Sequence, residues 1–240
     1  MTSLRILSLA TVALLCGGFA LAAFHAPMDA NEGFVQKIFY LHVPLALVAL
    51  GGFVFGAVAA VQHLRSGDPR HDLRSYVAIH LSLVLGIAVL VTGAIWAKAS
   101  WGIWWEWREP MLVSFLIVFL LYCTYQPLRF SIEDREKQSR YASVFAVTAG
   151  AFVPLCFGAV RAAESYIHPQ TFNSTDNLPG SMWLAFLVCL AGMTLLFVTL
   201  WRFEIAHKMT RARVRSLKRR LGGVDDPVVG RSAAPQLSSP

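Results

Sequence analysis

The chain has 240 residues, of which 56% are apolar and only 15% charged, and its mean hydropathy is +0.54. This composition excludes a soluble globular domain and favours an all-α, polytopic membrane protein with one membrane domain. The net charge of +7 does not indicate a nucleic-acid partner, because most of the excess Lys and Arg lies in loops and in a C-terminal stretch beside apolar segments.

Six apolar segments are expected to cross the bilayer as helices. They cover residues 4–23, 38–61, 76–96, 110–125, 141–160 and 182–203. The first segment could alternatively be a signal peptide that is removed, and the fourth is short for a span. Residues 1–207 are therefore expected to form the six-span domain, and residues 208–240 a basic, disordered cytoplasmic tail.

The distribution of positive charge predicts the orientation of the chain. When the loops between spans are assigned alternately to two sides, 17 of the 21 Lys and Arg residues fall on one side. The positive-inside rule makes that side cytoplasmic. Both termini would then be cytoplasmic, and the start of the second span, the segment 98–109 and the loop 161–180 would face outward.

The segment from Trp101 to Trp107 holds four of the seven tryptophans of the chain within seven positions. If it is helical, Trp101, Trp104 and Trp105 share one face. Its length and polarity favour a helix lying against the membrane surface rather than crossing it. Two interpretations stay open: an aromatic belt at the lipid boundary, or a shelf for a flat, apolar ligand.

Two histidines are expected on the same side of the membrane as this tryptophan segment. His42 lies about one turn inside the second span, and His168 lies in the outward loop. A lone histidine near a helix end is usually structural, but two beside an aromatic shelf suggest axial ligands of a planar metal macrocycle. Haem fits this inventory, because its propionates would pair with cations from a set close by. That set comprises Lys98, Arg108 and Arg161.

These motifs together resemble CcmC, the haem-handling membrane protein family of bacterial cytochrome c maturation. The resemblance rests on Tyr40-Leu41-His42-Val43-Pro44, on the tryptophan segment and on the loop histidine, and it covers residues from about 38 to 203. It implies that His42 and His168 are the axial ligands of the haem iron. It also implies a haem-binding motif formed by Trp101, Gly102, Trp104, Trp105 and Trp107.

The resemblance further implies a location and a set of partners. The protein would lie in the bacterial inner membrane and bind b-type haem transiently, as cargo, at the periplasmic face. It would present this haem to a covalent haem chaperone, while ABC transporter subunits of the same complex hydrolyse ATP. The protein itself would not be an enzyme.

The chain departs from the family pattern at two positions. Arg108 stands where the family has Asp after the last tryptophan, and Pro169 separates His168 from Gln170. Neither change removes a proposed ligand, and we expect Arg108 to pair with a haem propionate. Three alternatives stay open: a b-type cytochrome subunit with bis-histidine haem, the related haem-handling protein of the other cytochrome c synthesis system, and an assembly subunit that binds no haem.

Overall fold

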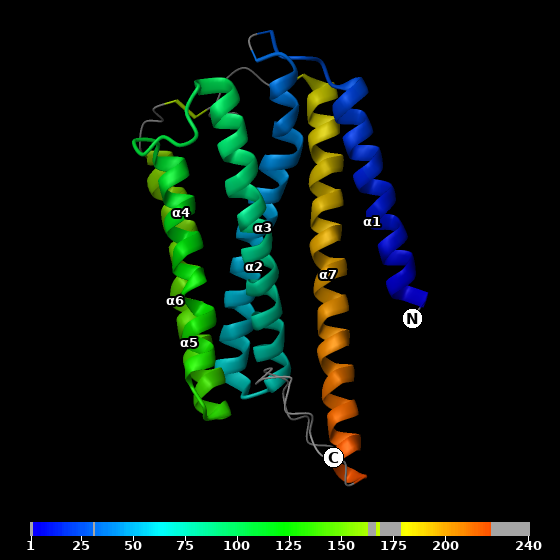
Figure 1. The fold of residues 1–240 in the computed structure, drawn as a ribbon, viewed down its shortest axis with the longest axis vertical. Helices are drawn as coiled ribbons and strands as arrows, with labels where there is room; N and C mark the ends of the chain where they lie inside the picture. The colour runs from blue at the N-terminus through cyan, green and yellow to red at the C-terminus, as the bar shows by residue number, and fades with distance from the viewer. Residues whose placement is uncertain (1, 31, 163–166, 169–178, 222–240) are drawn as a thin grey trace.

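The computed structural model describes residues 2–30, 32–162, 167–168 and 179–221. It is a bundle of long helices that run up and down between two ends (Figure 1). The helices are α1 (Thr2–Ala20), α2 (Phe39–Ser66), α3 (Pro69–Trp101), α4 (Pro110–Cys123), α5 (Tyr125–Ser131), α6 (Arg135–Ala162) and α7 (Gly180–Arg220). A π-helical turn, Leu21–His25, follows α1, and a 3-10 helix, Phe34–Ile38, precedes α2.

Six helical segments are long and apolar enough to span a membrane, which confirms the expected all-α, multi-pass architecture. Within the described ranges, the one β contact is an isolated bridge between Asp29 and Gly33. In Figure 1 the start of α1 and the end of α7 point toward the same end of the bundle. An even number of crossings requires this arrangement.

Several helices extend beyond their predicted bounds, because polar residues at the span ends continue the helical hydrogen bonding. The connection between the fourth and fifth predicted spans, residues 126–140, is shorter than expected, since residues 126–131 belong to α5 and α6 already begins at Arg135. The segment Pro110–Ser131, which comprises α4, Thr124 and α5, has 22 residues, enough to cross a bilayer. Residues 208–220, assigned above to the tail, continue α7, while residues 222–240 lie outside the described part of the chain.

The turn between α2 and α3 shows how the sequence sets the helix ends. Gly67 ends α2 in the left-handed conformation with a φ of 69°, which glycine adopts without strain. The Asp68 side chain accepts a hydrogen bond from Arg70 N at 2.8 Å, and Pro69 occupies the first turn of α3. The connection between the second and third predicted spans, expected at residues 62–75, therefore has only two residues.

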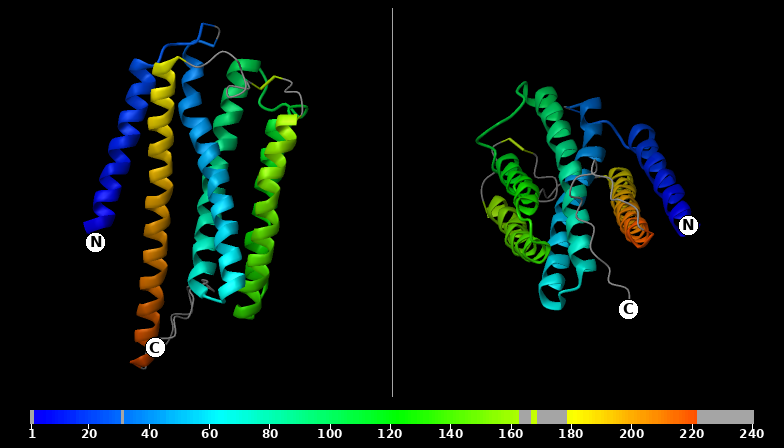
Figure 2. Two further views of the ribbon diagram at one scale, coloured as in Figure 1. Left: turned by 180° about the vertical axis from the view of Figure 1, so that it is seen from behind. Right: turned by 60° about the horizontal axis from the view of Figure 1, so that its bottom comes forward.

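Helix α2 packs against α3, α6 and α7, and α1 lies at the edge of the bundle against α7 (Figure 2). The hydroxyls of Thr11 in α1 and Thr199 in α7 form a buried hydrogen bond of 2.8 Å. A side chain at Gly18 would meet Cys189 Sγ at 3.0 Å, so the absence of a Cβ lets the two helices approach closely. α1 is thus an integral part of the packed bundle.

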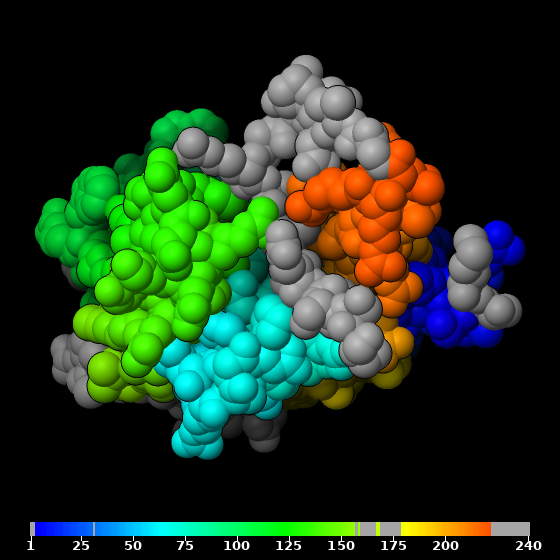
Figure 3. Space-filling model, turned by 90° about the horizontal axis from the view of Figure 1, so that it is seen from below, coloured from blue at the N-terminus to red at the C-terminus, as the bar shows by residue number. Residues whose placement is uncertain are grey.

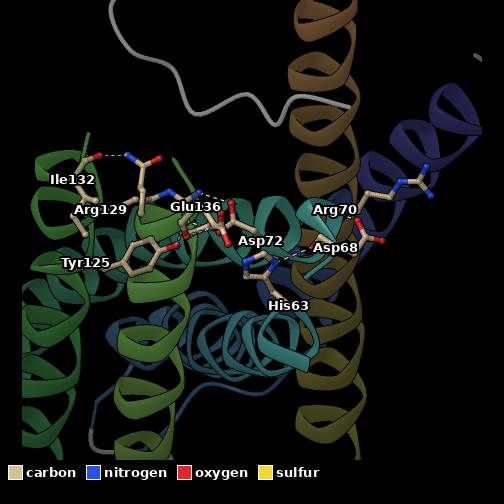
Figure 4. A network of polar contacts seen from close by, with 10 residues as sticks. His63, Asp68, Arg70, Asp72, Tyr125, Arg129, Ile132 and Glu136 are labelled. Carbon is tan, nitrogen blue, oxygen red and sulfur yellow. Dashed lines mark hydrogen bonds and ion pairs between the residues drawn. The ribbon is translucent and has the colours of Figure 1, made fainter. Parts of the chain in front are cut away.

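Figure 3 shows the end of the bundle that carries the α2–α3 turn, seen from below. A buried ion pair holds this end together (Figure 4). The guanidinium of Arg129 in α5 donates to both carboxylate oxygens of Asp72 in α3, at 2.7 and 2.6 Å, and to the Tyr125 hydroxyl at 3.1 Å. This bidentate geometry fixes α5 against α3 and satisfies two charges that would be costly to bury alone.

Candidate functional site

Segments that are distant in the sequence meet at the other end of the bundle. The start of α2, the end of α3 and the loop from α3 to α4 lie together there (Figure 1). His42 comes from the first of these segments and Trp101 from the second.

His42 is half-buried near the start of α2, and its side chain contacts α3. Its Nδ1 lies 2.9 Å from the Thr92 hydroxyl oxygen, and that hydroxyl donates to the Ala88 carbonyl at 2.8 Å. Since the hydroxyl proton is used in this second bond, Thr92 accepts from His42, which puts the imidazole proton on Nδ1. The lone pair of Nε2 then remains available for a metal.

The surroundings of His42 include two further residues of α3 and one of the loop before α2. A Cβ at Gly93 would lie 2.8 Å from His42 Cε1, so only glycine leaves room for the ring. The Trp96 indole contacts the imidazole edge-on, with ring centroids 5.8 Å apart. Trp96 Nε1 donates to Glu32 Oε2 at 3.0 Å, which orients the indole. Helix geometry and packing therefore hold His42 rigidly.

The tryptophan segment is not an interfacial helix, so the predicted shared helical face is wrong. Helix α3 ends at Trp101, because Gly102 takes the left-handed conformation with a φ of 75° and donates its N–H to the Lys98 carbonyl. The Lys98 ammonium donates a hydrogen bond to the Gly102 carbonyl at 2.7 Å. Residues 102–109 follow as an irregular loop, and α4 starts at Pro110.

The indoles of this loop are partly open to the surroundings. Trp104 is 60% exposed and Trp107 is 71% exposed, whereas Trp105 is half-buried and contacts Trp107 edge-on at 5.9 Å. The Trp105 Nε1 atom is buried and lacks a hydrogen-bond partner in the described structure. Apolar rings and an unused N–H donor thus lie in one short loop.

His168 is attached to this loop through Glu109, the residue that caps α4. The Glu109 carboxylate is buried and accepts from the backbone N–H groups of Ile167 at 2.9 Å and His168 at 3.0 Å. Its other oxygen accepts from Met111 N at 3.4 Å. Burial alone would raise the pKa of this carboxyl, but the three N–H donors, together with the nearby His168 side chain, outweigh it and lower the pKa.

The two predicted ligands lie in the same region of the molecule. The His168 ring contacts Trp101 edge-on, with centroids 6.2 Å apart. His42 and His168 are close enough to interact electrostatically. The structure thus brings together the two histidines and the first tryptophan, although residues 42 and 168 are 126 positions apart in the sequence.

The three cations considered for the propionates differ in their surroundings. The Arg108 side chain is 75% exposed, and its Nε lies 3.6 Å from Glu106 Oε1. The Lys98 ammonium lies 6.0 Å from the Trp104 ring centroid. The side chain of Arg161 lies outside the described part of the structure.

Sequence reasoning missed the residues that hold the two histidines in place. Thr92, Gly93 and Trp96 lie on one stretch of α3, and Glu109 lies two positions after Trp107, at the start of α4. Trp96 had a weak signal, as a tryptophan five positions before Trp101. Thr92 and Glu109 had none, because their partners are 50 and 58 or 59 positions away.

Several known proteins are similar to this chain over most of its length. A family model described as Heme exporter protein C, CcmC, matches residues 1–220. The chain is 30% identical to Heme exporter protein C of Rhodobacter capsulatus over 214 residues, 88% of each chain. It is 31% identical to the protein of that name from Bradyrhizobium diazoefficiens over 216 residues, 88% of this chain and 81% of that one. The protein of that name from Paracoccus denitrificans is also 31% identical, over 81% of each chain.

Proposed function

The chain belongs to the Heme exporter protein C family, and from that premise we propose that it binds haem at the periplasmic face of the bacterial inner membrane. In this proposal the haem is b-type and transient, a cargo rather than a resident cofactor. The protein presents it to a covalent haem chaperone for cytochrome c maturation. Members of the family are named for haem export, and this multi-pass chain has a role in haem handling.

The observation that supports the proposal most strongly is which nitrogen of the His42 ring is hydrogen-bonded. Its Nδ1 is used by Thr92 at 2.9 Å, so Nε2 is the nitrogen that can bind iron. His168 supplies the second axial nitrogen from a short stretch anchored by backbone hydrogen bonds to Glu109. One ligand on a helix and one on a loop suit a protein that must release its haem, because the loop can open while the bundle stays folded.

The irregular loop 102–109, called the tryptophan loop below, supplies the surface for the macrocycle. Trp104 and Trp107 expose apolar rings that a porphyrin face would cover. The unpartnered Trp105 N–H suits a propionate oxygen, because a buried donor without an acceptor is costly. Trp101, beside His168, and Gly102, which turns the chain out of α3, complete the haem-binding motif.

In this proposal the protein binds and orients haem and makes or breaks no covalent bond itself. ABC transporter subunits of the maturation complex would hydrolyse ATP, and the chaperone would form the covalent bond to haem. The competing function is that of a b-type cytochrome, which retains its haem and transfers electrons. The placement of His168 in a short non-helical stretch, rather than on a facing helix, favours the carrier.

The two functions are separated by haem transfer. The purified protein is loaded with haem in detergent and mixed with an excess of a soluble apo-haem-binding protein. We expect a bis-histidine absorption spectrum that passes to the acceptor. A spectrum that stays with the membrane protein would support the electron-transfer function, and the lack of any haem spectrum would support the assembly subunit.

The proposed ligand state of His42 predicts the effect of Thr92→Val. Valine has a similar shape but cannot accept the Nδ1–H bond of 2.9 Å, so the ring loses its fixed orientation. Loss of such an outer-shell partner commonly costs about 10- to 100-fold in metal affinity. We expect a haem affinity lower by about ten-fold, measured by titration in detergent.

The matched control is Thr194→Val in α7, since the Thr194 hydroxyl also bonds a carbonyl of its own helix, that of Leu190 at 2.7 Å. This variant should bind haem like the wild type. Equal affinities of Thr92→Val and Thr194→Val would show that Thr92 does not orient a ligand.

We expect the exposed guanidinium of Arg108 to contact a haem propionate. A guanidinium can bind a carboxylate through two parallel hydrogen bonds, each worth about 1.5–3 kcal/mol, although its ion pair with Glu106 and water compete. Arg108→Gln should therefore weaken haem binding by about three- to ten-fold, less than a full charge-assisted bond would give. The variant should bind the dimethyl ester of haem as the wild type does. Equal loss of affinity for haem and its ester would contradict the contact.

A further inference from the structure

Glu109 uses its two carboxylate oxygens for two different segments. Oε1 accepts from Met111 N at 3.4 Å and caps the first turn of α4. Oε2 accepts from the N–H groups of both Ile167 and His168, at 2.9 and 3.0 Å. The residue is only 1% exposed, so water does not compete for these bonds.

Glu109 holds this segment through its backbone N–H groups. A carboxylate that accepts N–H bonds in a buried position forms stronger bonds than a neutral acceptor would. Because both loop bonds go to the backbone, they fix the position of the His168 Cα without using a ring nitrogen. The ring is then directed toward Trp101, 6.2 Å away between centroids, within electrostatic reach of His42.

We propose that Glu109 is the positioning residue for His168. Its carboxylate links the Ile167–His168 backbone to the tryptophan loop by two hydrogen bonds, and loss of these bonds releases the haem. The proposal rests on the proposed function, since it assumes that His168 binds iron. It joins the two parts of the site, the aromatic loop and the loop ligand, through one side chain.

A cap of α4 alone would explain only the bond to Met111, and the variant Glu109→Asp separates the two roles. Aspartate is a good N-cap, and it stands before a proline at the start of α3, where Asp68 caps Arg70 N at 2.8 Å. Its shorter side chain keeps the cap of α4 but does not reach Ile167 and His168. Glu109→Gln keeps the length of the side chain and replaces one acceptor oxygen by an N–H donor, which cannot accept from the loop while the other oxygen caps the helix.

Two measurements on the full chain test the proposal, one of them without haem. Amide hydrogen exchange of the haem-free protein reports whether Ile167 and His168 are held. Haem dissociation and the absorption spectrum report whether the fastening acts on the ligand. The control is Asp68→Asn, the equivalent amide substitution at the cap of α3 on the opposite end of the bundle.

We expect Glu109→Asp and Glu109→Gln to speed exchange at residues 167–168 and to raise the haem dissociation rate about ten-fold. Part of the haem should shift from low spin to high spin, and imidazole should reverse the shift. Asp68→Asn should change neither measurement. Unchanged exchange at residues 167–168, or faster exchange with unaltered haem dissociation and spin state, would overturn the proposal.

Failure of the proposed function gives a different result. In that case wild-type protein shows no bis-histidine spectrum, whatever the exchange data say. Faster exchange in both Glu109 variants would then leave Glu109 as a structural fastener of the loop, and would refute its role in placing an iron ligand.

Discussion

Replacing either His42 or His168 with alanine is expected to convert six-coordinate, low-spin haem into five-coordinate or weakly ligated haem. Each substitution removes one of the two nitrogens proposed to bind the iron. The affinity should fall by at least about ten-fold, which corresponds to about 1.4 kcal/mol. Added imidazole should enter the vacated position and restore the low-spin band, as measured by absorption spectroscopy.

The two variants should differ in their effect on the haem-free protein. His42 packs against Gly93 and Trp96 and bonds Thr92, so its removal opens a small gap between α2 and α3. The His168 backbone, by contrast, keeps its bond to Glu109 when the ring is removed. An unchanged bis-histidine spectrum in both single variants would place the ligands elsewhere, with His25 and His80 as the next candidates.

The double variant Trp104→Ala, Trp105→Ala should lower haem occupancy without preventing membrane insertion. Insertion is distributed over six spans, none of which includes these residues. Trp104 is 60% exposed, so its loss costs the folded protein little packing. Removing the apolar ring and the Trp105 N–H should lower haem affinity by about ten-fold or more, since an aromatic contact and a hydrogen bond are each worth about 0.5–1.5 kcal/mol.

The control for an aromatic belt is Trp201→Ala at the other end of the bundle. Trp201 Nε1 donates to the Arg74 carbonyl at 3.3 Å, near the α2–α3 turn. This variant should retain full haem occupancy. If the double variant keeps its haem but loses thermal stability, the tryptophans of the loop are an anchor rather than a binding surface.

Much of the bundle could be predicted from the sequence because membrane spans have a strong and local signal. Twenty or so apolar residues in a row can be recognised without any knowledge of their neighbours. The helix ends were less accurate, since polar residues such as Arg70 and Lys208 continue the helices beyond the apolar stretches. The helix predicted after α3 was wrong because a single residue, Gly102, determines where α3 ends.

The sequence singled out the histidines and tryptophans of the candidate site, but not the contacts that hold them in place. Histidine and tryptophan are rare and chemically distinctive, so His42 and the tryptophan segment stood out. The partner of a threonine or glutamate depends instead on which helix packs beside it. The contacts of Thr92 with His42 and of Glu109 with His168 join positions 50 and 59 residues apart, and such pairs have no local pattern.

A cryo-EM structure of the haem-loaded protein would test the central claim most directly. We predict iron between His42 Nε2 and a ring nitrogen of His168, at the end of the bundle that carries the tryptophan loop. His42 Nδ1 should keep its bond to Thr92. Haem buried between helices inside the bundle, or ligated by other residues, would contradict this account.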